Sequence, residues 1–157
     1  SPVVLDADAL NNLSAGKRWS LVPKQSILTP HIGELARMVG KQNSGFEYLQ
    51  AAKAFADEHG FYIVVKGPHT AIVSPNAETW FNSTGNQGMG TAGSGDALTG
   101  MVTSFLAQGY DPKEAAILGV YFHGLAGDIA AIENGFSGLI ASDIINHIPS
   151  AIKSFEA

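Results

Sequence analysis

Short apolar runs and amphipathic stretches alternate along the first part of the chain. Residues 3–5 and 26–28 are short runs rich in apolar side chains, and apolar positions with helical spacing follow each of them, at 10–15 and 35–39. A longer amphipathic stretch covers residues 46–59. This order predicts two strand–helix units followed by a further helix.

The middle of the chain has the pattern of a sheet. Residues 61–65 form an unbroken apolar run, which is typical of a strand covered on both faces. Turns at Gly67-Pro68 and Pro75-Asn76 separate this run from residues 70–73 and 79–81. The three segments therefore predict an antiparallel meander.

Helical patterns dominate the last third, at about 94–108, at about 113–133 and in shorter helices from Ala141 onwards. The stretch 113–133 is apolar almost all round, which predicts a buried helix, and Gly119, Gly124 and Gly127 permit close approach by its neighbours. We interpret His123 and Asp128 within it as a satisfied core histidine and a packing carboxylate. The whole chain, 1–157, predicts one α/β domain with a mainly parallel sheet.

Composition narrows the choice of partners. The chain has 157 residues, of which 45% are apolar and 15% charged, so it can bury a core but has few charges for its surface. The mean hydropathy of +0.10 adds to the expectation that a second subunit or another segment covers part of that surface. The net charge is −5, and no Lys or Arg occurs between Lys66 and Lys113, which argues against nucleic acid and anionic membranes. Cysteine is absent, which excludes thiolate chemistry, and together with the lack of a signal peptide this leads us to expect a soluble, cytoplasmic protein.

The stretch 82–100 contains six glycines and a single charged residue, Asp96. Because glycine loses much chain entropy on folding, such a loop indicates positive φ angles or a ligand close to the backbone. The predicted helix begins in this stretch, at Ser94, and the amides at its N-terminus favour an anion such as phosphate. A carboxylate beside a phosphate is explained if Asp96 is a base or holds a metal.

Other interpretations of this loop are weaker. Residues 88–93 match the dinucleotide fingerprint G-x-G-x-x-G by letter, but no acid ends a second strand about twenty residues later. No Gly-Lys-Ser/Thr follows the glycines, which excludes a P-loop. A flexible surface loop capped by Ser94 stays as the non-functional alternative.

Polar residues follow the predicted strands at four places, namely Asp6-Ala7-Asp8, 29–34, 66–70 and the glycine loop. Since the carboxyl ends of parallel strands gather at one edge of a sheet, these segments are expected to converge. Lys66 can meet a phosphate there, and Asp6 and Glu34 can hold Mg²⁺ through water. Each also has a plain interpretation, for example Asp8 as a helix cap and Glu34 as a solvated residue.

Five motifs in a fixed order resemble one family. They are Leu5-Asp6-Ala7-Asp8-Ala9-Leu10-Asn11, Thr29-Pro30-His31-x-Gly33-Glu34, Val65-Lys66-Gly67-x-x-Thr70, Thr84-Gly85-Asn86 and Gly93-Ser94-Gly95-Asp96-x-Leu98-Thr99-Gly100. With these motifs the chain resembles the ADP- or ATP-dependent NAD(P)H-hydrate dehydratases of the ribokinase-like superfamily. The resemblance implies a three-layer α/β/α fold and the dehydration of hydrated NADH or NADPH (NAD(P)HX), coupled to hydrolysis of ADP or ATP in the presence of Mg²⁺.

The resemblance also implies roles for individual residues. Asp96 corresponds to the base that accepts the proton of the attacking hydroxyl, and His31 and Asp96 correspond to residues that contact the hydrated nicotinamide. Glu34 is the candidate metal ligand. The implied nucleotide-binding residues are Lys66, Gly67, Pro68, His69, Thr70, Asn86, Gly93, Ser94 and Gly95.

One part of the family pattern lies outside this sequence. Members of the family carry an N-terminal segment with several strands and a Gly-Pro-Gly loop that contributes to the substrate site, whereas this chain starts almost on the Asp-Ala-Asp strand. We therefore expect that this chain is the C-terminal part of the domain, with its first strand at an edge and with a second copy or the missing segment as partner.

Two alternative functions stay open, namely a small-molecule kinase and a nucleotide-binding fragment without activity of its own. The choices between ADP and ATP and between NADHX and NADPHX also stay open.

Overall fold

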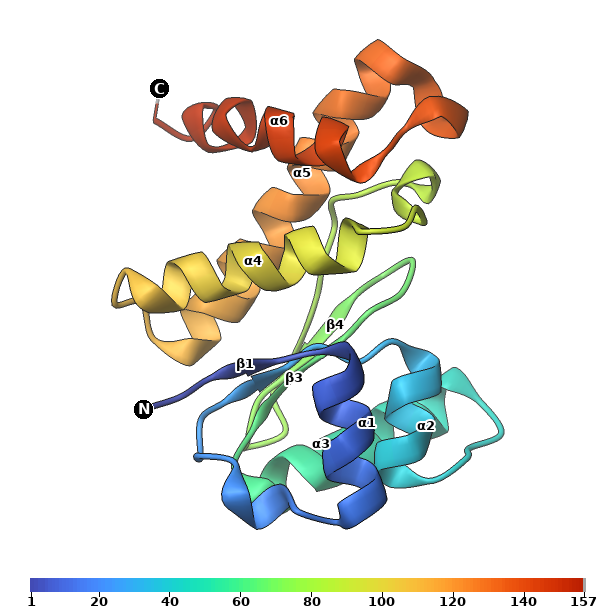
Figure 1. Ribbon diagram of the computed structural model, residues 1–157, viewed down its shortest axis with the longest axis vertical. Helices are drawn as coiled ribbons and strands as arrows, with labels where there is room; N and C mark the ends of the chain where they lie inside the picture. Colours follow the sequence, from blue (N-terminus) through green and yellow to red (C-terminus); the bar gives the residue numbers. More distant parts are fainter. Residues whose placement is uncertain (157) are drawn as a thin grey trace.

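The computed structural model describes residues 1–156, and Figure 1 shows its layers. The strands are β1 (Val4–Leu5), β2 (Ile27–Leu28), β3 (Tyr62–Val65), β4 (Ala71–Val73) and β5 (Thr79–Phe81). The helices are α1 (Ala7–Gly16), α2 (Ile32–Val39), α3 (Gly45–His59), α4 (Ser94–Ala107), α5 (Pro112–Gly138) and α6 (Ala141–Lys153). Two 3₁₀ turns, η1 (Trp19–Leu21) and η2 (Gln87–Met89), complete the elements.

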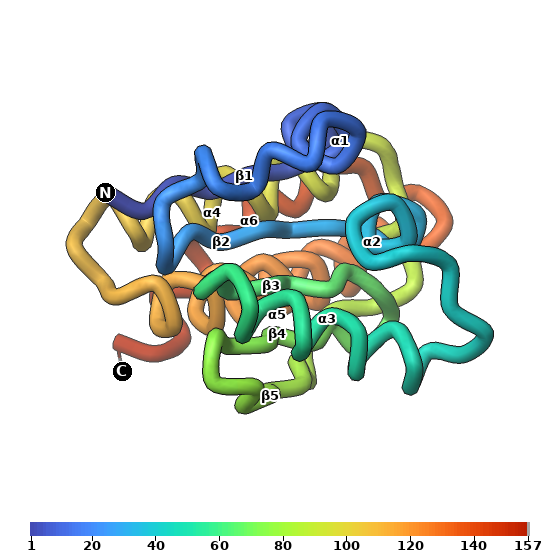
Figure 2. The backbone as a smooth tube through the Cα atoms, turned by 90° about the horizontal axis from the view of Figure 1, so that it is seen from below, coloured from blue at the N-terminus to red at the C-terminus, as the bar shows by residue number. Residues whose placement is uncertain are grey.

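The five strands form one sheet in the order β1-β2-β3-β4-β5. The first three strands are parallel, and β4 and β5 continue the sheet antiparallel, as the meander pattern predicted. Helices α1, α2 and α3 cover one face, α4 and α5 cover the other, and α6 packs on the outside of that second helical layer (Figures 1 and 2). The predicted three-layer α/β fold is confirmed, and β1 is an edge strand of the described sheet.

Neighbouring residues of a strand serve opposite faces of this sheet. Leu28 and Ile63 are buried toward α1–α3, whereas Ile27 and Val64 are buried with Leu98 and other side chains of α4 and α5. Because side chains alternate across a strand, only an apolar run without interruption fills both layers. This explains the unbroken pattern of residues 61–65 and places the sheet at the centre of the core.

Helix α5 is the long buried helix that the sequence predicts. Its glycines permit close packing, since a Cβ on Gly119 would lie 2.6 Å from a side-chain carbon of Val102. The helix is longer than the predicted 113–133, and Gly135, with a φ of 68°, interrupts its last turns. By length and composition α5 could also cross a membrane, but 56% of its most apolar window is buried inside the fold, as expected for a core helix.

Candidate functional site

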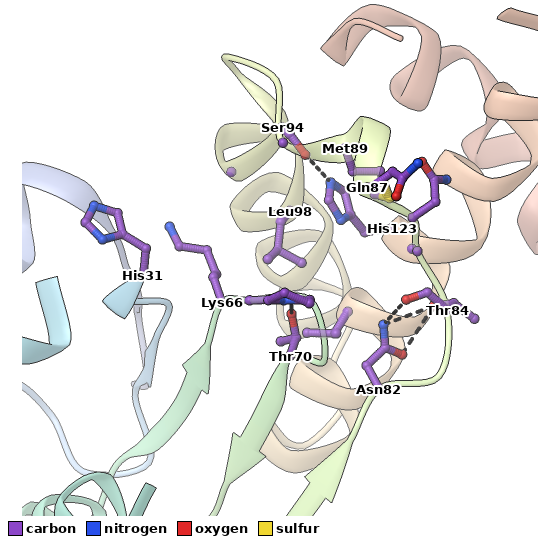
Figure 3. Close-up of a pocket in the computed structure, with 18 of the residues that line it drawn as sticks. His31, Lys66, Thr70, Asn82, Thr84, Gln87, Met89, Ser94, Leu98 and His123 are labelled. Atoms are coloured by element: carbon purple, nitrogen blue, oxygen red, sulfur yellow. Dashed lines mark hydrogen bonds between the residues drawn. The ribbon is translucent and has the colours of Figure 1, made fainter. Parts of the chain in front are cut away.

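A cavity of about 820 Å³ lies at the carboxyl end of the parallel strands, between the sheet and the glycine-rich segment (Figure 3). Eight residues of the predicted site line it, namely His31, Lys66, Gly67, Pro68, Thr70, Asn86, Ser94 and Gly95. Four others, Glu34, His69, Gly93 and Asp96, are not among its lining residues. The segments that the sequence places at strand ends therefore do converge, and those four residues lie near them in the chain.

Lys66 is the charged residue at the centre of this edge. It follows β3, and its backbone N–H donates to the carbonyl of Pro30, which joins the ends of β2 and β3. Its ammonium Nζ lies 2.8 Å from Asp6 Oδ1 and 3.8 Å from Glu34 Oε2. The lysine predicted to meet a phosphate is therefore already paired with two largely buried carboxylates.

Asp6 links three elements through its carboxylate. One oxygen accepts from Lys66 and from the Ala7 amide at the start of α1, and the other accepts from the Thr99 hydroxyl of α4 at 2.7 Å. Burial raises the pKa of Asp6, but the hydrogen bonds and the Lys66 charge outweigh this effect and hold the pKa below its usual range. Asp6, rather than the anticipated Asp8, is the N-cap of α1.

His31 and Glu34 form a capping box at the start of α2. His31 Nδ1 accepts from the amides of Gly33 and Glu34, and the Glu34 carboxylate accepts from the His31 amide at 2.8 Å. These bonds assign the ring proton to Nε2, which lies 3.3 Å from Glu34 Oε1. Glu34 is only 5% exposed, so the interpretation of it as a solvated residue is wrong.

The N-terminus of α4 lies beside Lys66. Gly93 is its N-cap, with a φ of 84°. The Ser94 amide donates to the Thr91 carbonyl, and no side chain caps the amides that follow it in the first turn. A Cβ added to Gly95 would lie 3.5 Å from Lys66 Nζ, so the ammonium approaches the first turn of α4 closely. Asp96 is exposed in that same turn. The Lys66 ammonium and a helix N-terminus without a side-chain cap thus lie next to one carboxylate, which suits a phosphoryl group.

The opposite wall of the cavity is fastened to α5. Asp128 accepts from the Gly85 amide at 2.8 Å and from the Asn86 side-chain amide at 2.9 Å. The other end of the Asn86 side chain accepts from the Gly88 amide. From the sequence alone we interpret Asp128 as a packing carboxylate and do not identify its hydrogen bond with Asn86. The available signal for such a partner is a carboxylate in an otherwise apolar helix.

His123 is buried in the cavity wall. Its Nε2 lies 3.4 Å from the Ser94 hydroxyl (Figure 3). Burial lowers the pKa of His123 to about 4, against a smaller opposing effect of its hydrogen bond with Ser94, so the ring is neutral near pH 7. The prediction of a satisfied core histidine agrees with this environment, although its place in the cavity wall was not foreseen.

Residues 1–156 contain no group of three or more His, Asp or Glu side chains that could hold a metal ion by themselves. Asp6 and Glu34 nevertheless approach the same ammonium from two sides. Carboxylate oxygens suit Mg²⁺, which commonly binds one or two carboxylates together with phosphate oxygens of its substrate. Since both Asp6 oxygens already accept hydrogen bonds, Glu34 is the carboxylate that fits a magnesium ion arriving with a nucleotide and bound through water.

A three-layer fold with a helix N-terminus at the carboxyl edge of its sheet is that of the ribokinase-like proteins. A ribokinase-like superfamily protein from Enterococcus faecalis matches 99% of the chain with a TM-score of 0.84 and 30% identity, over 53% of its own length. The family model for NAD(P)H-hydrate dehydratase matches residues 1–150, and the chain belongs to this family.

Two further relatives show how much of such proteins the chain spans. It is 40% identical, over 99% of its length, to the bifunctional NAD(P)H-hydrate repair enzyme Nnr of Moorella thermoacetica, of which it covers 30%. The crystal structure of the ADP/ATP-dependent NAD(P)H-hydrate dehydratase from Bacillus subtilis, co-crystallized with ATP/Mg²⁺, matches 98% of the chain with a TM-score of 0.86 and 36% identity. The chain covers 55% of that structure. It thus spans about half, or less, of these relatives.

Proposed function

We propose that this chain carries the nucleotide half of an enzyme that dehydrates NAD(P)HX to NADH or NADPH while ADP or ATP is hydrolysed. The observation that carries this proposal is the approach of Lys66 to the first turn of α4, in which Asp96 is exposed. A helix N-terminus and an ammonium stabilise a transferring phosphoryl group, and a nearby carboxylate can take a proton. Membership of the dehydratase family supports the choice of substrate.

In the proposed reaction Asp96 acts as the general base. It accepts the proton of the ring hydroxyl, whose oxygen forms a bond to the terminal phosphorus while the bond from that phosphorus to the nucleotide breaks. The carbon–oxygen bond of this phosphate ester then breaks, inorganic phosphate leaves with the bonding electrons, and loss of a proton from the adjacent ring atom restores the ring double bond. His31, exposed at the mouth of the cavity, is proposed to contact the nicotinamide together with Asp96.

The nucleotide is proposed to lie between the end of β3 and the glycine-rich segment. The proposed contacts are Lys66, Gly67, Pro68, His69, Thr70, Asn86, Gly93, Ser94 and Gly95. Because both ends of the Asn86 side chain are engaged by Asp128 and Gly88, its contribution is to shape the wall. Glu34, the predicted metal ligand, would hold Mg²⁺ through water, and the ion would neutralise phosphate charge when bound.

Recovery of the reduced cofactor tests the activity. The chain is incubated with NADHX or NADPHX, Mg²⁺ and ADP or ATP, and absorbance is followed at ~340 nm, where the reduced nicotinamide absorbs. Asp96→Asn is expected to abolish turnover and to leave the nucleotide dissociation constant, measured by calorimetry, within about twofold. Asp57→Asn, on the exposed face of α3, is the matched control. Near-normal turnover by Asp96→Asn would contradict the role of the base.

Two observations are also compatible with other functions, which the experiments can distinguish. An anion-binding helix N-terminus with an acid also fits a kinase of a small alcohol, which would phosphorylate its substrate without recovery of NAD(P)H. The chain spans about half of its relatives, which fits a fragment that binds ADP but needs another segment for turnover. Calorimetry with ADP and Mg²⁺ separates these, because an absence of nucleotide binding would contradict all three.

We also propose that residues 1–157 form a single ribokinase-like unit that works in the cytoplasm with a partner. Large apolar side chains are exposed in the last turns of α5, namely Ile132 at 85% and Phe136 at 51%. Surfaces of this kind favour association with a second copy or with a segment such as the longer relatives carry. Sedimentation of the chain at several concentrations tests self-association.

A further inference from the structure

We propose that Asp6 is a positioning residue that sets Lys66 and the first turns of α4 relative to each other. The inference rests on the proposed function, because it assigns a purpose to the place where Lys66 meets the helix that carries Asp96. No sequence motif assigns this task to Asp6, which is seen only when the contacts across the sheet are known.

The first step of the argument is the geometry of the carboxylate. Asp6 lies at the end of β1, and its two oxygens have separate partners on two other elements: Lys66 after β3 at 2.8 Å and Thr99 of α4 at 2.7 Å. The Asp6 side chain is only 10% exposed, so these charge-assisted bonds are little weakened by water. One rigid group therefore spans the gap between the sheet and α4.

The second step is the place of Thr99 on its helix. Thr99 follows Asp96 by three residues, so the two side chains lie one above the other on the same face of α4. A second contact, 3.5 Å from Thr99 to the buried Thr29 hydroxyl, lies at the same point. Holding Thr99 therefore fixes both the rotation of α4 about its axis and the direction of Asp96.

The third step is that the backbone around Asp6 is itself constrained. Ala7 adopts a φ of 49°, a left-handed conformation that is unfavourable for a residue with a Cβ, and its amide donates to the Asp6 carboxylate. Strain of this kind persists only where surrounding contacts hold it, and it is common at functional sites. The contacts of Asp6 are thus retained although they require an unfavourable backbone conformation at Ala7.

Removal of one hydroxyl tests the proposal. Thr99→Val keeps the shape of the side chain and deletes the bond to Asp6, and we expect kcat to fall about tenfold or more while KM for NAD(P)HX changes less than about twofold. Thr99→Ser, which retains the hydroxyl, is expected to restore most of kcat. Thr103→Val is the matched control, since Thr103 lies one turn further along α4, is exposed and bonds only to the Thr99 carbonyl in the structure.

A double-mutant comparison shows whether Thr99 acts through Asp6. In an Asp6→Ala background, Thr99→Val is expected to lower kcat by less than about twofold, because the bond is already absent. Full additivity of the two effects would overturn the proposal, as would an unchanged kcat in a folded Thr99→Val protein.

A measurement that needs no turnover keeps this inference separate from the proposed function. The Ala97 amide bonds to the Gly93 carbonyl in the first turn of α4, and its hydrogen exchange reports how firmly that turn is held. We expect faster exchange in Thr99→Val and Asp6→Ala than in the unmodified chain and no change in Thr103→Val. Equal exchange in all four proteins would overturn the positioning role, whereas absence of dehydration by the unmodified chain would contradict only the proposed function.

Discussion

Gly124 shows how a single missing side chain shapes the cavity. A Cβ at this position would lie 2.2 Å from the Thr84 hydroxyl oxygen and 2.8 Å from the Thr84 carbonyl carbon. These distances are far below a van der Waals contact, and a backbone carbon cannot turn aside as a flexible side chain can. The wall formed by Thr84 therefore depends on glycine in α5.

Gly124→Ala is accordingly expected to destabilise the fold by about 1–3 kcal/mol, the usual cost of overpacking. The measurement is urea unfolding followed by circular dichroism. Gly100→Ala is the matched control, because Gly100 is also helical, is exposed and has open space at its Cβ position. There the substitution is expected to be neutral or to stabilise α4 by up to about 1 kcal/mol, and a similar loss in both variants would contradict this account.

His123 predicts a dependence of stability on pH. Its pKa is lowered by burial to about 4 in the folded chain, so between about pH 4 and pH 6.5 the unfolded chain binds a proton that the folded chain does not. Stability is therefore expected to fall as the pH decreases through that range, by an amount on the order of 3 kcal/mol in total. Urea unfolding of His123→Gln should show a weaker dependence, and an equal slope would contradict the assignment.

His147 provides a contrast with the opposite sign. Its ring bonds to the Asp143 carbonyl and lies 3.2 Å from Glu133, and these contacts raise its pKa in spite of a small effect of burial. A raised pKa stabilises the folded state at low pH, and this contribution is lost as the pH rises through the folded value. His147→Gln is therefore expected to lower stability more at pH 5 than at pH 8, as followed by thermal unfolding at both values.

At the scale of elements, the segment from Thr84 to Met89 depends on α5 for its shape. Asp128 bonds to both Gly85 and Asn86, and Gly127 leaves room for the Met89 side chain. An irregular segment with few backbone bonds of its own is positioned by such contacts. The order of this segment, and with it the shape of the cavity wall, therefore depends on its contacts with α5.

Asp128→Ala is expected to loosen this segment while the sheet stays intact. Without the carboxylate, the Gly85 amide loses its partner, so its hydrogen exchange should become faster, and the affinity for ADP should fall because the wall is less ordered. Exchange and calorimetry measure the two effects. Asp57→Ala, on the exposed face of α3, should change neither, and unaltered exchange at Gly85 in Asp128→Ala would contradict the link.

Periodicity predicts the elements well but not their ends or their caps. The apolar run 61–65 and the spacing in 94–108 identify β3 and α4 because burial on both faces, or on one face, leaves a pattern in the sequence. The N-cap of α1 is Asp6 and not the anticipated Asp8, because several polar residues compete at this helix start and tertiary contacts decide which of them caps the helix. The interruption at Gly135 has no pattern of its own, since glycine is also common inside α5.

The candidate site shows a similar division. That Lys66 and the start of α4 belong to one edge follows from strand ends and loop composition, and the cavity contains both. That Lys66 is paired with Asp6, and Asp128 with Asn86, could not be predicted, because these partners are separated by 60 and 42 residues and no local pattern links them. Charged side chains that are predicted to face a ligand, such as Lys66 and Asp6, can instead form an ion pair with each other.

At the scale of the whole molecule, the cavity is shared between two layers. Lys66 belongs to the edge of the sheet, whereas Ser94 and His123 belong to the helices that cover one face. A ligand that contacts both must therefore be released when these layers separate on unfolding. Binding and global stability are linked for this reason.

ADP with Mg²⁺ is accordingly expected to raise the thermal unfolding midpoint. At a concentration about one hundred times Kd the stabilisation is about 2.7 kcal/mol, which corresponds to roughly 5–10 °C for a chain of this size. Differential scanning calorimetry measures the shift, and Lys66→Met should diminish it. Adenosine, which lacks phosphate, is the matched ligand control, and an equal shift with adenosine would contradict a phosphate site at α4.

The order of the strands has a consequence for synthesis. Each strand lies beside the one that precedes it in the chain, so the sheet can grow as the polypeptide leaves the ribosome. The Asp6–Thr99 hydrogen bond instead joins residues 93 positions apart. A nascent chain halted before Thr99 would therefore contain all five strands yet lack both this contact and α5, whose Asp128 holds the cavity wall, so that the site is completed only after the sheet.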